Sequence, residues 1–242
     1  MKTRIMIALL LALALTLGLC ACSEKAPSET TAPSASTPTP ENPGTPTGTT
    51  EPEGGFSMAQ VKAEINSMQV SDFTESDQPT DYVKLSVKDF GEIVVRLRDD
   101  VAPISTQNFR DLVGRGYYNG TVFHRVYPGF MIQGGAGSEE LSPIKGEFSI
   151  NGVENPLSHI RGVLSMARTT VNDSATSQFF LVQADSSSFL DGKYAAFGYV
   201  VAGLETVDEI CKIELGVNPY DGEQSVPQVD VIIESAAFVT PK

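Results

Sequence analysis

Apolar and polar residues alternate along the chain from residue 82 onward. Val83, Leu85 and Val87 are separated by polar residues, and the alternation returns over 93–97 after a short Asp-Phe-Gly turn. A period of two places successive side chains on opposite faces of a strand. The pattern therefore predicts a β-hairpin in this part of the chain.

A helical spacing follows the hairpin. Pro103 suits the first turn of a helix, where its missing N–H has no intrahelical partner to lose. The predicted helix has about a dozen residues, which is a common length. Its buried face would consist of Phe109, Leu112 and Val113, and Gly114 favours termination. We therefore predict an amphipathic helix that begins at Pro103.

Short apolar segments bounded by Gly and Pro make up most of the remaining chain. They predict strands over 121–126, 129–134, 162–167, 178–183, 196–201 and 229–238. A second helix is predicted over 204–212, with these inward positions: Leu204, Val207, Ile210 and Cys211. Cys211 then acts as a small buried hydrophobe. This composition of elements predicts a mainly β fold, a closed antiparallel β-barrel with two capping α-helices.

Residues 56–81 carry a weaker pattern. Met58, Val61, Ile65 and Met68 have the spacing of one side of a short helix. We interpret this segment as a weakly helical lead-in to the domain formed by 82–242.

The N-terminal residues 1–21 have the features of a targeting signal. A short basic start precedes an apolar run that is too short to span a bilayer and suits a signal-peptide core. The run ends in Leu-Cys-Ala-Cys, which resembles the lipobox of bacterial lipoproteins. Cys22 is the better lipid-attachment candidate than Cys20, because the residue before it is small. We expect an extracytoplasmic protein, lipid-anchored to a bacterial membrane; an ordinary cleaved signal with an incidental Cys pair is the alternative.

The segment 22–55 is rich in Pro, Thr, Ser and Glu. Beyond Cys22 it contains no Val, Ile, Leu, Met or aromatic residue. Such a segment cannot bury enough apolar surface to offset its ordering entropy, so we predict a disordered linker. It would serve either as a tether that lifts the domain off the membrane or as a spacer without a length requirement.

The overall charge and the scarcity of metal ligands exclude several function classes. The 242 residues carry a formal net charge of −13, which disfavours a nucleic-acid partner because phosphate binding needs clustered cations. The folded part has one cysteine, Cys211, and two histidines. This excludes an intramolecular disulfide framework and disfavours a structural zinc site. We expect no metal or other cofactor, and a monomer.

The segment 123–135, FHRVYPGFMIQGG, is the most informative for chemistry. Strand alternation would put Phe123 and Arg125 on one face, and Phe130 with Ile132 on one face of the next strand. Taken alone, an arginine in a strand is usually solvated, and aromatic positions are usually core. The segment by itself therefore leaves a purely structural interpretation open.

Several other motifs accompany the segment 123–135 along the chain. They are Pro103 to Arg110 of the first helix, Tyr118 to Thr121, Gly162 to Ala167, Ser177 to Phe180, Leu190 to Lys193 and Phe197-Gly198. In their order and near their spacing, these motifs resemble the cyclophilin family of peptidyl-prolyl isomerases. The resemblance runs from about Tyr82 to Val239.

The resemblance implies a role for each matching position. Arg125 corresponds to the family's catalytic arginine, and Gln133 to the glutamine that supports the arginine and the substrate. The pocket for the proline ring would consist of Phe130, Met131, Phe180 and Leu190. Other members of the substrate groove would be His124, Ala167 and Gln178.

Three groove positions depart from the family pattern. Arg168 takes a position that is usually Asn, where backbone groups meet the substrate chain, so its cationic side chain is expected to alter groove specificity. Phe189 stands where many members carry Trp, and Tyr194 where some carry His. Both keep an aromatic ring, so the pocket should persist. Because Phe lacks the indole N–H, we expect weaker binding of the cyclic peptide cyclosporin than in Trp-bearing members.

These residues suit rotation about an X–Pro bond, whose barrier of roughly 18–20 kcal/mol comes from amide resonance. No bond is made or broken, so the reaction needs an apolar slot and a donor aimed at the prolyl nitrogen. The predicted function is therefore a peptidyl-prolyl cis/trans isomerase that acts on proline-containing segments of unfolded or exported proteins and assists their folding. The alternatives are a binding module with little turnover and a structural envelope lipoprotein; Arg125 together with Gln133 favours catalysis.

Overall fold

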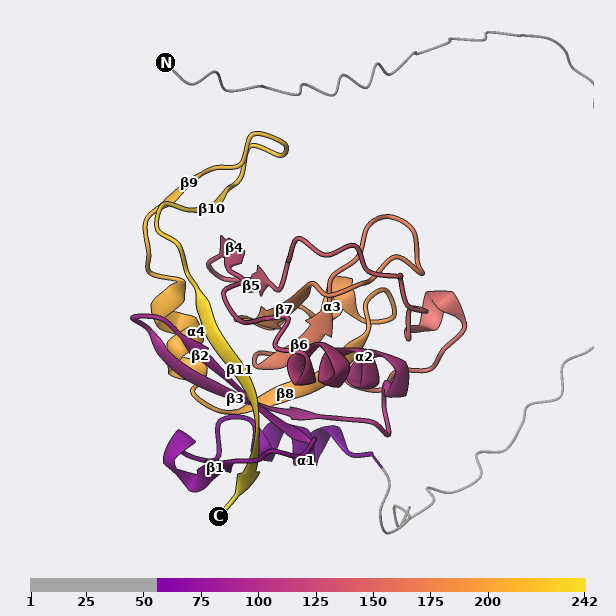
Figure 1. The fold of residues 1–242 in the computed structure, drawn as a ribbon. Coiled ribbons are helices and arrows are strands. Elements are labelled where there is room, and N and C mark those ends of the chain that lie inside the picture. The colour runs from indigo at the N-terminus through magenta and orange to yellow at the C-terminus, as the bar shows by residue number, and fades with distance from the viewer. Residues whose placement is uncertain (1–55) are drawn as a thin grey trace, which may run out of the picture. The chain divides into compact units, whose positions relative to one another are not determined.

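The computed structural model describes residues 56–242. The predicted signal peptide, Cys22 and the linker lie outside the described residues. Figure 1 shows a curved antiparallel sheet with short helices around it. Its strands are β1 (Phe73–Glu75), β2 (Tyr82–Val87), β3 (Gly91–Leu97), β4 (Phe123–Tyr127), β5 (Met131–Gly134), β6 (Val163–Met166), β7 (Phe179–Val182), β8 (Ala196–Ala202) and β11 (Ile233–Pro241). A separate hairpin consists of β9 (Leu215–Val217) and β10 (Gln224–Pro227).

The helices are short and lie between the strands in the sequence. They are α1 (Met58–Glu64), α2 (Pro103–Gly114), α3 (Ser187–Leu190) and α4 (Leu204–Ile210), with 3₁₀ turns η1 (Val70–Asp72) and η2 (Ser149–Asn151). Within residues 56–242, none of these helices has the length and apolar character needed to cross a bilayer.

The sheet has nine strands in the order β1-β11-β2-β3-β8-β6-β7-β5-β4. The predicted mainly β, antiparallel architecture is confirmed. The predicted closed barrel is not: among the described residues, no ladder joins the β4 edge to the other end of the sheet. The contact there consists of an isolated bridge between Val122 and Ile232 and three backbone hydrogen bonds: from the Phe123 N–H to the Val231 carbonyl at 2.9 Å, from the Gly120 N–H to the Ile233 carbonyl at 2.7 Å and from the Ile233 N–H to the Thr121 carbonyl at 2.8 Å.

The predicted hairpin and first helix form as expected and enclose the core. β2 pairs with β3 in the register Val83 with Val95, and both side chains are fully buried. Phe109 of α2 packs its ring 5.4 Å from Phe179 and 5.3 Å from Phe197, which lie on the sheet. The apolar face read from the sequence is thus the face that α2 buries.

The start of α2 is held by a buried carboxylate from a distant loop. Ala102, the residue before the helix, supplies no side-chain cap. The Glu147 carboxylate, only 2% exposed, accepts from the backbone N–H groups of Ile104 at 2.9 Å and Ser105 at 2.8 Å. These are the first N–H groups of the helix, which lack intrahelical partners, and the negative charge also suits the positive end of the helix dipole.

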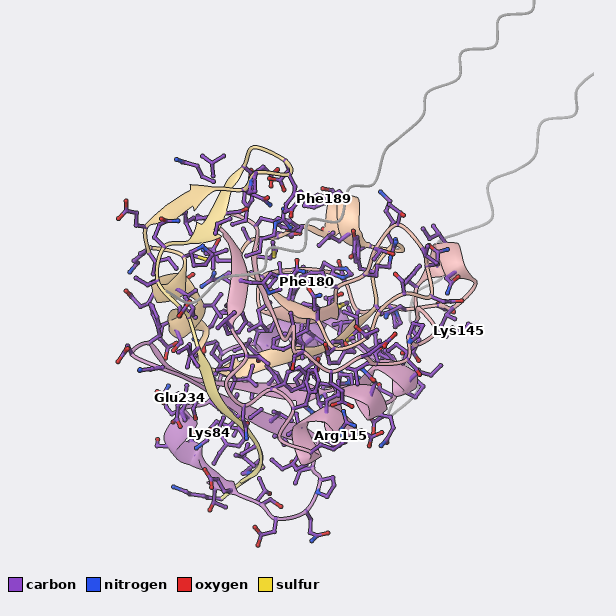
Figure 2. All side chains as sticks on the ribbon, turned by 45° about the horizontal axis from the view of Figure 1, so that its top comes forward. Lys84, Arg115, Lys145, Phe180, Phe189 and Glu234 are labelled. Carbon is purple, nitrogen blue, oxygen red and sulfur yellow. The ribbon has the colours of Figure 1, made fainter. Side chains whose placement is uncertain are left out.

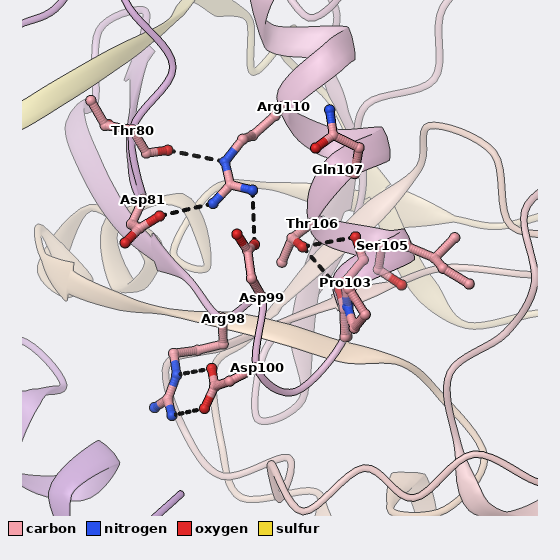
Figure 3. Close-up of polar contacts among 12 residues, drawn as sticks. Thr80, Asp81, Arg98, Asp99, Asp100, Pro103, Ser105, Thr106, Gln107 and Arg110 are labelled. Atoms are coloured by element: carbon pink, nitrogen blue, oxygen red, sulfur yellow. Dashed lines mark hydrogen bonds and ion pairs between the residues drawn. The ribbon is translucent and has the colours of Figure 1, made fainter. Parts of the chain in front are cut away.

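An arginine on the same helix ties α2 to the segments beside it (Figure 3). Arg110 donates to the Thr80 carbonyl at 3.1 Å and pairs with Asp81 at 2.9 Å and Asp99 at 2.8 Å. The Glu147 carboxylate at the start of α2 and the Arg110 side chain therefore hold the helix against the rest of the domain.

The lead-in segment packs on the domain through polar contacts. Glu64, the last residue of α1, accepts from the Arg96 guanidinium and the Tyr199 hydroxyl, which belong to β3 and β8. The Asn66 N–H donates to the Val200 carbonyl at 3.1 Å, and Val61 is fully buried. The helical spacing in this segment therefore reflects a face that contacts the sheet.

Several short elements escaped the sequence analysis. β1, β9 and α3 have only three or four residues, too few to show a period. The last strand begins at residue 233 rather than 229, and Val229 is 56% exposed. Cys211 follows α4 and is half-buried rather than buried. Burial and the nearby Asp208 carboxylate raise the pKa of the Cys211 thiol to about 11, which keeps it protonated.

Candidate active site

A cavity of about 360 Å³ gathers residues from β4, β5, β7 and α3 and from the loops that follow β6 and α3. Its lining consists of Arg125, Phe130, Met131, Gln133, Ala167, Arg168, Phe180, Phe189, Leu190, Lys193 and Tyr194. Every lining residue except Lys193 is among the sequence-predicted site residues. His124 and Gln178 are predicted site residues that do not line it.

The floor of the cavity is apolar and buried, and part of its rim is exposed. Met131, Phe180 and Leu190 have exposed fractions of 1–4%. At the rim, Phe189 is 47% exposed and its ring centroid lies 5.3 Å from that of Phe130. Figure 2 shows Phe180 on the sheet and Phe189 on α3. The geometry suits a small apolar ring inserted from solvent.

A polar network around the buried His159 supports the floor from behind. The His159 ring stacks on Phe180 at 6.1 Å and 18°. One ring nitrogen lies 2.8 Å from Asp191 Oδ1 and the other 2.9 Å from Ser165 Oγ. The arrangement resembles a Ser-His-Asp triad, but Ser165 and His159 are at most 1% exposed, so no substrate reaches them. The network therefore positions Phe180; the sequence analysis gave His159 no role.

The guanidinium of Arg125 is held by a residue that the sequence analysis missed. Gln133 is the register partner of Arg125 on β5, yet its amide donates to Gln178 Oε1 at 3.0 Å. Arg125 Nη2 instead donates to Glu223 Oε2 at 2.9 Å. Glu223 precedes β10 and does not line the cavity, so it contacts the guanidinium without occupying the space for a ligand.

Two predicted side-chain directions are wrong, one because of a β-bulge and one because of a turn. The register of β4 against β5 shifts between Phe123 and Arg125. Phe123 is therefore buried in the core at 1% exposure, whereas Arg125 lines the cavity; they do not share a face. Phe130 lies in the turn before β5, outside the strand alternation, and lines the cavity although Ile132 does not.

His124 lies beside the cavity rather than in it. Its Nδ1 atom is buried and has no hydrogen-bond partner among the described residues. Burial lowers the pKa of His124, and the neighbouring Arg125 charge acts in the same direction. A neutral imidazole at this position adds no further charge next to Arg125.

One wall of the cavity is built around Arg168. Its guanidinium carbon lies 4.9 Å from the ring centre of Phe148 and 4.7 Å from that of Tyr194. Its Nε and Nη2 atoms donate to the Lys193 carbonyl at 2.9 and 2.7 Å. Stacking and hydrogen bonds hold the cation in one place.

A larger hollow of about 730 Å³ lies beside α2, and none of the predicted site residues lines it.

Across residues 56–242, no three His, Cys, Asp or Glu side chains are grouped as metal ligands.

Comparison with protein families agrees with this geometry. The model of the family described as "Cyclophilin type peptidyl-prolyl cis-trans isomerase/CLD" matches residues 82–237. The chain belongs to the cyclophilin family. This cyclophilin is 44% identical over 160 residues to "Peptidyl-prolyl cis-trans isomerase A" of Dickeya dadantii, an alignment that covers 62% of this chain and 80% of the relative. It is 42% identical over 158 residues to "Peptidyl-prolyl cis-trans isomerase B" of Escherichia coli, covering 60% and 92%.

Solved structures share the fold. A cyclophilin-type peptidyl-prolyl cis-trans isomerase of Cryptosporidium parvum, crystallised in the presence of the dipeptide Ala-Pro, superposes with a TM-score of 0.55 at 26% identity and covers 65% of this chain and 98% of its own. A cyclophilin from Hirschia baltica gives 0.53 at 25% identity, covering 76% and 80%. These structural matches concern the folded domain.

Proposed function

We propose that this cyclophilin is a peptidyl-prolyl cis/trans isomerase. The observation that carries the proposal is one cavity in which an arginine, fixed from outside, lies beside a buried apolar floor. Family membership and the names of the relatives support it.

The proposed mechanism divides the work between the floor and Arg125. Met131, Phe180 and Leu190 would hold the proline ring while the carbonyl side of the bond rotates. As the bond twists, amide resonance is lost and the prolyl nitrogen gains electron density. An N–H of Arg125 aimed at that nitrogen stabilises the twisted state more than either planar state, which is what lowers a barrier. The side-chain amides of Gln133 and Gln178 are hydrogen-bonded to each other and would form a polar edge of the substrate groove.

The direct test is Arg125→Ala. We expect the variant to fold, because the Arg125 side chain is 29% exposed and is not part of the core. Its kcat/KM on a proline peptide should fall by about 100-fold, the usual effect of removing one transition-state donor. NMR exchange between the cis and trans peptide signals measures this.

The control for that test is Arg115→Ala. Arg115 is half-exposed, pairs with Glu139 and lies outside the cavity, so its loss should leave turnover unchanged. Equal activity of Arg125→Ala and the unmodified protein would refute the mechanism. A protein that binds the peptide but shows no exchange in either form would instead be a binding module for proline-containing segments.

The wider organisation is proposed from the sequence. Residues 1–21 would be a signal peptide, Cys22 the lipid-bearing residue and 22–55 a linker, which would place the domain outside the cytoplasm on a bacterial membrane. There it would act as a monomer on exported proteins. Labelling with palmitate should mark the protein, and Cys22→Ser should abolish the label while Cys20→Ser keeps it; label on both variants would disprove attachment at Cys22.

Within this organisation, 82–242 would be the isomerase domain and 56–81 its lead-in. We also propose that the contact between Val122 and Ile232 is the seam of a closed barrel. Protection of the Phe123 N–H from hydrogen exchange to the same degree as the N–H groups within β2 would support the seam, and fast exchange would argue against it.

A further inference from the structure

We infer that the groove selects proline segments with an acidic side chain, Asp or Glu, next to the proline. This inference rests on the proposed function and adds a substrate class to it. Three cations line the cavity, Arg125, Arg168 and Lys193, and no carboxylate does. The charge of the cavity lining is therefore positive, whereas the whole chain has a formal net charge of −13.

Arg168 is unusual for this protein because no carboxylate neutralises it. The other six arginines of residues 56–242 all pair with Asp or Glu: Arg96, Arg98, Arg110, Arg115, Arg125 and Arg161. Among the seven lysines of these residues only Lys84 and Lys212 are paired, so Lys193 is one of several free lysines, and its distinction is its place next to Arg168 on the cavity. Neither Arg168 nor Lys193 has an ion pair within these residues. In a chain with so many carboxylates, two unpaired cations side by side on one cavity indicate a site for an external anion.

Arg168 is preorganised for that role. Its guanidinium has five N–H donors. Three hydrogen bonds hold it, two to the Lys193 carbonyl and one from Nη1 to the Thr169 carbonyl at 2.8 Å. The stacked rings of Phe148 and Tyr194 keep the cation in place without cancelling its charge. Donors remain for a ligand, and the planar fork matches a carboxylate.

Lys193 adds a second charge at the same wall. Its side chain is exposed, while its backbone carbonyl anchors Arg168. A substrate carboxylate beside the ring would therefore meet a fixed cation and an adjustable one. Arg125 contributes less to this attraction, because Glu223 already neutralises it.

The predicted preference is moderate and salt-dependent. Two partly exposed ion pairs correspond to about a three- to tenfold gain in affinity. Exposed charges are screened over about 8 Å at physiological ionic strength and over about 3 Å at 1 M salt, so the preference should shrink at high salt.

The experiment compares short peptides that differ at one position beside proline, with Glu, Gln or Lys placed first before and then after the ring. NMR exchange gives kcat/KM without a coupling protease, whose own specificity would interfere, and NMR titration gives the affinity. The variants are Arg168→Gln, Lys193→Gln and the double variant. Lys193→Gln changes only an exposed side chain, so it remains informative if Arg168→Gln fails to fold. The matched control is Lys88→Gln, an exposed lysine in the β2–β3 turn with no ion pair in the described region.

We expect Glu peptides to exceed Lys peptides by about three- to tenfold at one of the two positions. Lys193→Gln should reduce that ratio, the double variant should bring it near one, and Lys88→Gln should leave it unchanged. Equal values for the three peptides at both positions, or a ratio that survives in the double variant, would overturn the inference. The two proposals fail in different ways. A preference for Glu peptides in the titration without any cis/trans exchange would support the acidic selectivity and refute the isomerase proposal. Exchange of all peptides at equal rates would support the isomerase proposal and refute the acidic selectivity.

Discussion

Glu223 is predicted to act as a positioning residue for Arg125. The carboxylate comes from the β9–β10 hairpin and accepts a hydrogen bond from Arg125 Nη2 at 2.9 Å. Arg125 lines the cavity, and Glu223 does not. No Arg125–Gln133 hydrogen bond forms within the described residues, so Glu223 supplies the side-chain hydrogen bond that fixes the guanidinium, which also lies 6.0 Å from the centre of the Tyr127 ring. Glu223→Ala removes this contact without removing any group that a ligand would touch.

The size of the effect follows from the exposure of the pair. The two side chains are 29% and 39% exposed, so solvent screens their attraction. Pairs of this kind contribute about 0.2–1 kcal/mol. A tenfold change in rate corresponds to about 1.4 kcal/mol of activation free energy. If the loss of the ion pair reduces the stabilisation of the transition state by its full contribution, turnover should slow by roughly 1.5- to 5-fold. KM should change little, because Glu223 does not line the cavity.

A second effect of the same carboxylate has the opposite sign. Its negative charge weakens the field of Arg125 at the prolyl nitrogen, so its removal could raise the rate. Glu223→Gln separates the two effects, because it keeps an oxygen acceptor and removes the charge. If positioning dominates, kcat falls in the order Glu, Gln, Ala.

The assay is NMR exchange at several peptide concentrations, which resolves kcat from KM. Glu234→Ala is the control, since Glu234 is exposed on β11 and lies away from Phe180 and Phe189 in Figure 2. Higher kcat in both Glu223 variants than in the unmodified protein would refute the positioning role. A change confined to KM would also refute it.

Two further predictions concern the rim and acid stability. Phe189→Trp should strengthen cyclosporin binding, measured by calorimetry, because it restores an indole N–H donor at a 47% exposed rim position; unchanged affinity would contradict this explanation. Burial by itself raises the pKa of Glu64 and of Asp191 and is the largest single influence on each. Hydrogen bonds from Tyr199, Gln60 and Arg96 to Glu64, and from His159 and Ser158 to Asp191, together with the nearby positive charges, outweigh it and leave both pKa values below normal. Such carboxylates stabilise the fold above the unfolded-state pKa of about 4, and this stability is lost as the pH falls through their folded values. The urea midpoint should therefore drop between about pH 5 and pH 3, less so in Asp191→Asn; equal midpoints at both pH values would be inconsistent with this linkage.

The alternation and helical spacing of the sequence were sufficient for the main elements, because those patterns are local. The hairpin around Val83, the helix that begins at Pro103 and the second helix from Leu204 all form where the apolar period predicts them. Three-residue strands such as β1 and β9 carry no readable period, and they exist because neighbouring backbone pairs with them.

For the site, the sequence by itself determined which side chains belong together through their resemblance to one family, and the cavity unites all of those residues except His124 and Gln178. Only the tertiary structure decided how they are held. Glu223 lies 98 residues beyond Arg125, and Asp191 lies 32 residues from His159, so no local pattern joins them. A one-residue bulge turned Arg125 away from the face of Phe123, since an inserted residue shifts every later side chain of a strand to the other face. Contacts between distant segments depend on how the chain folds back on itself, and that is what sequence periodicity leaves open.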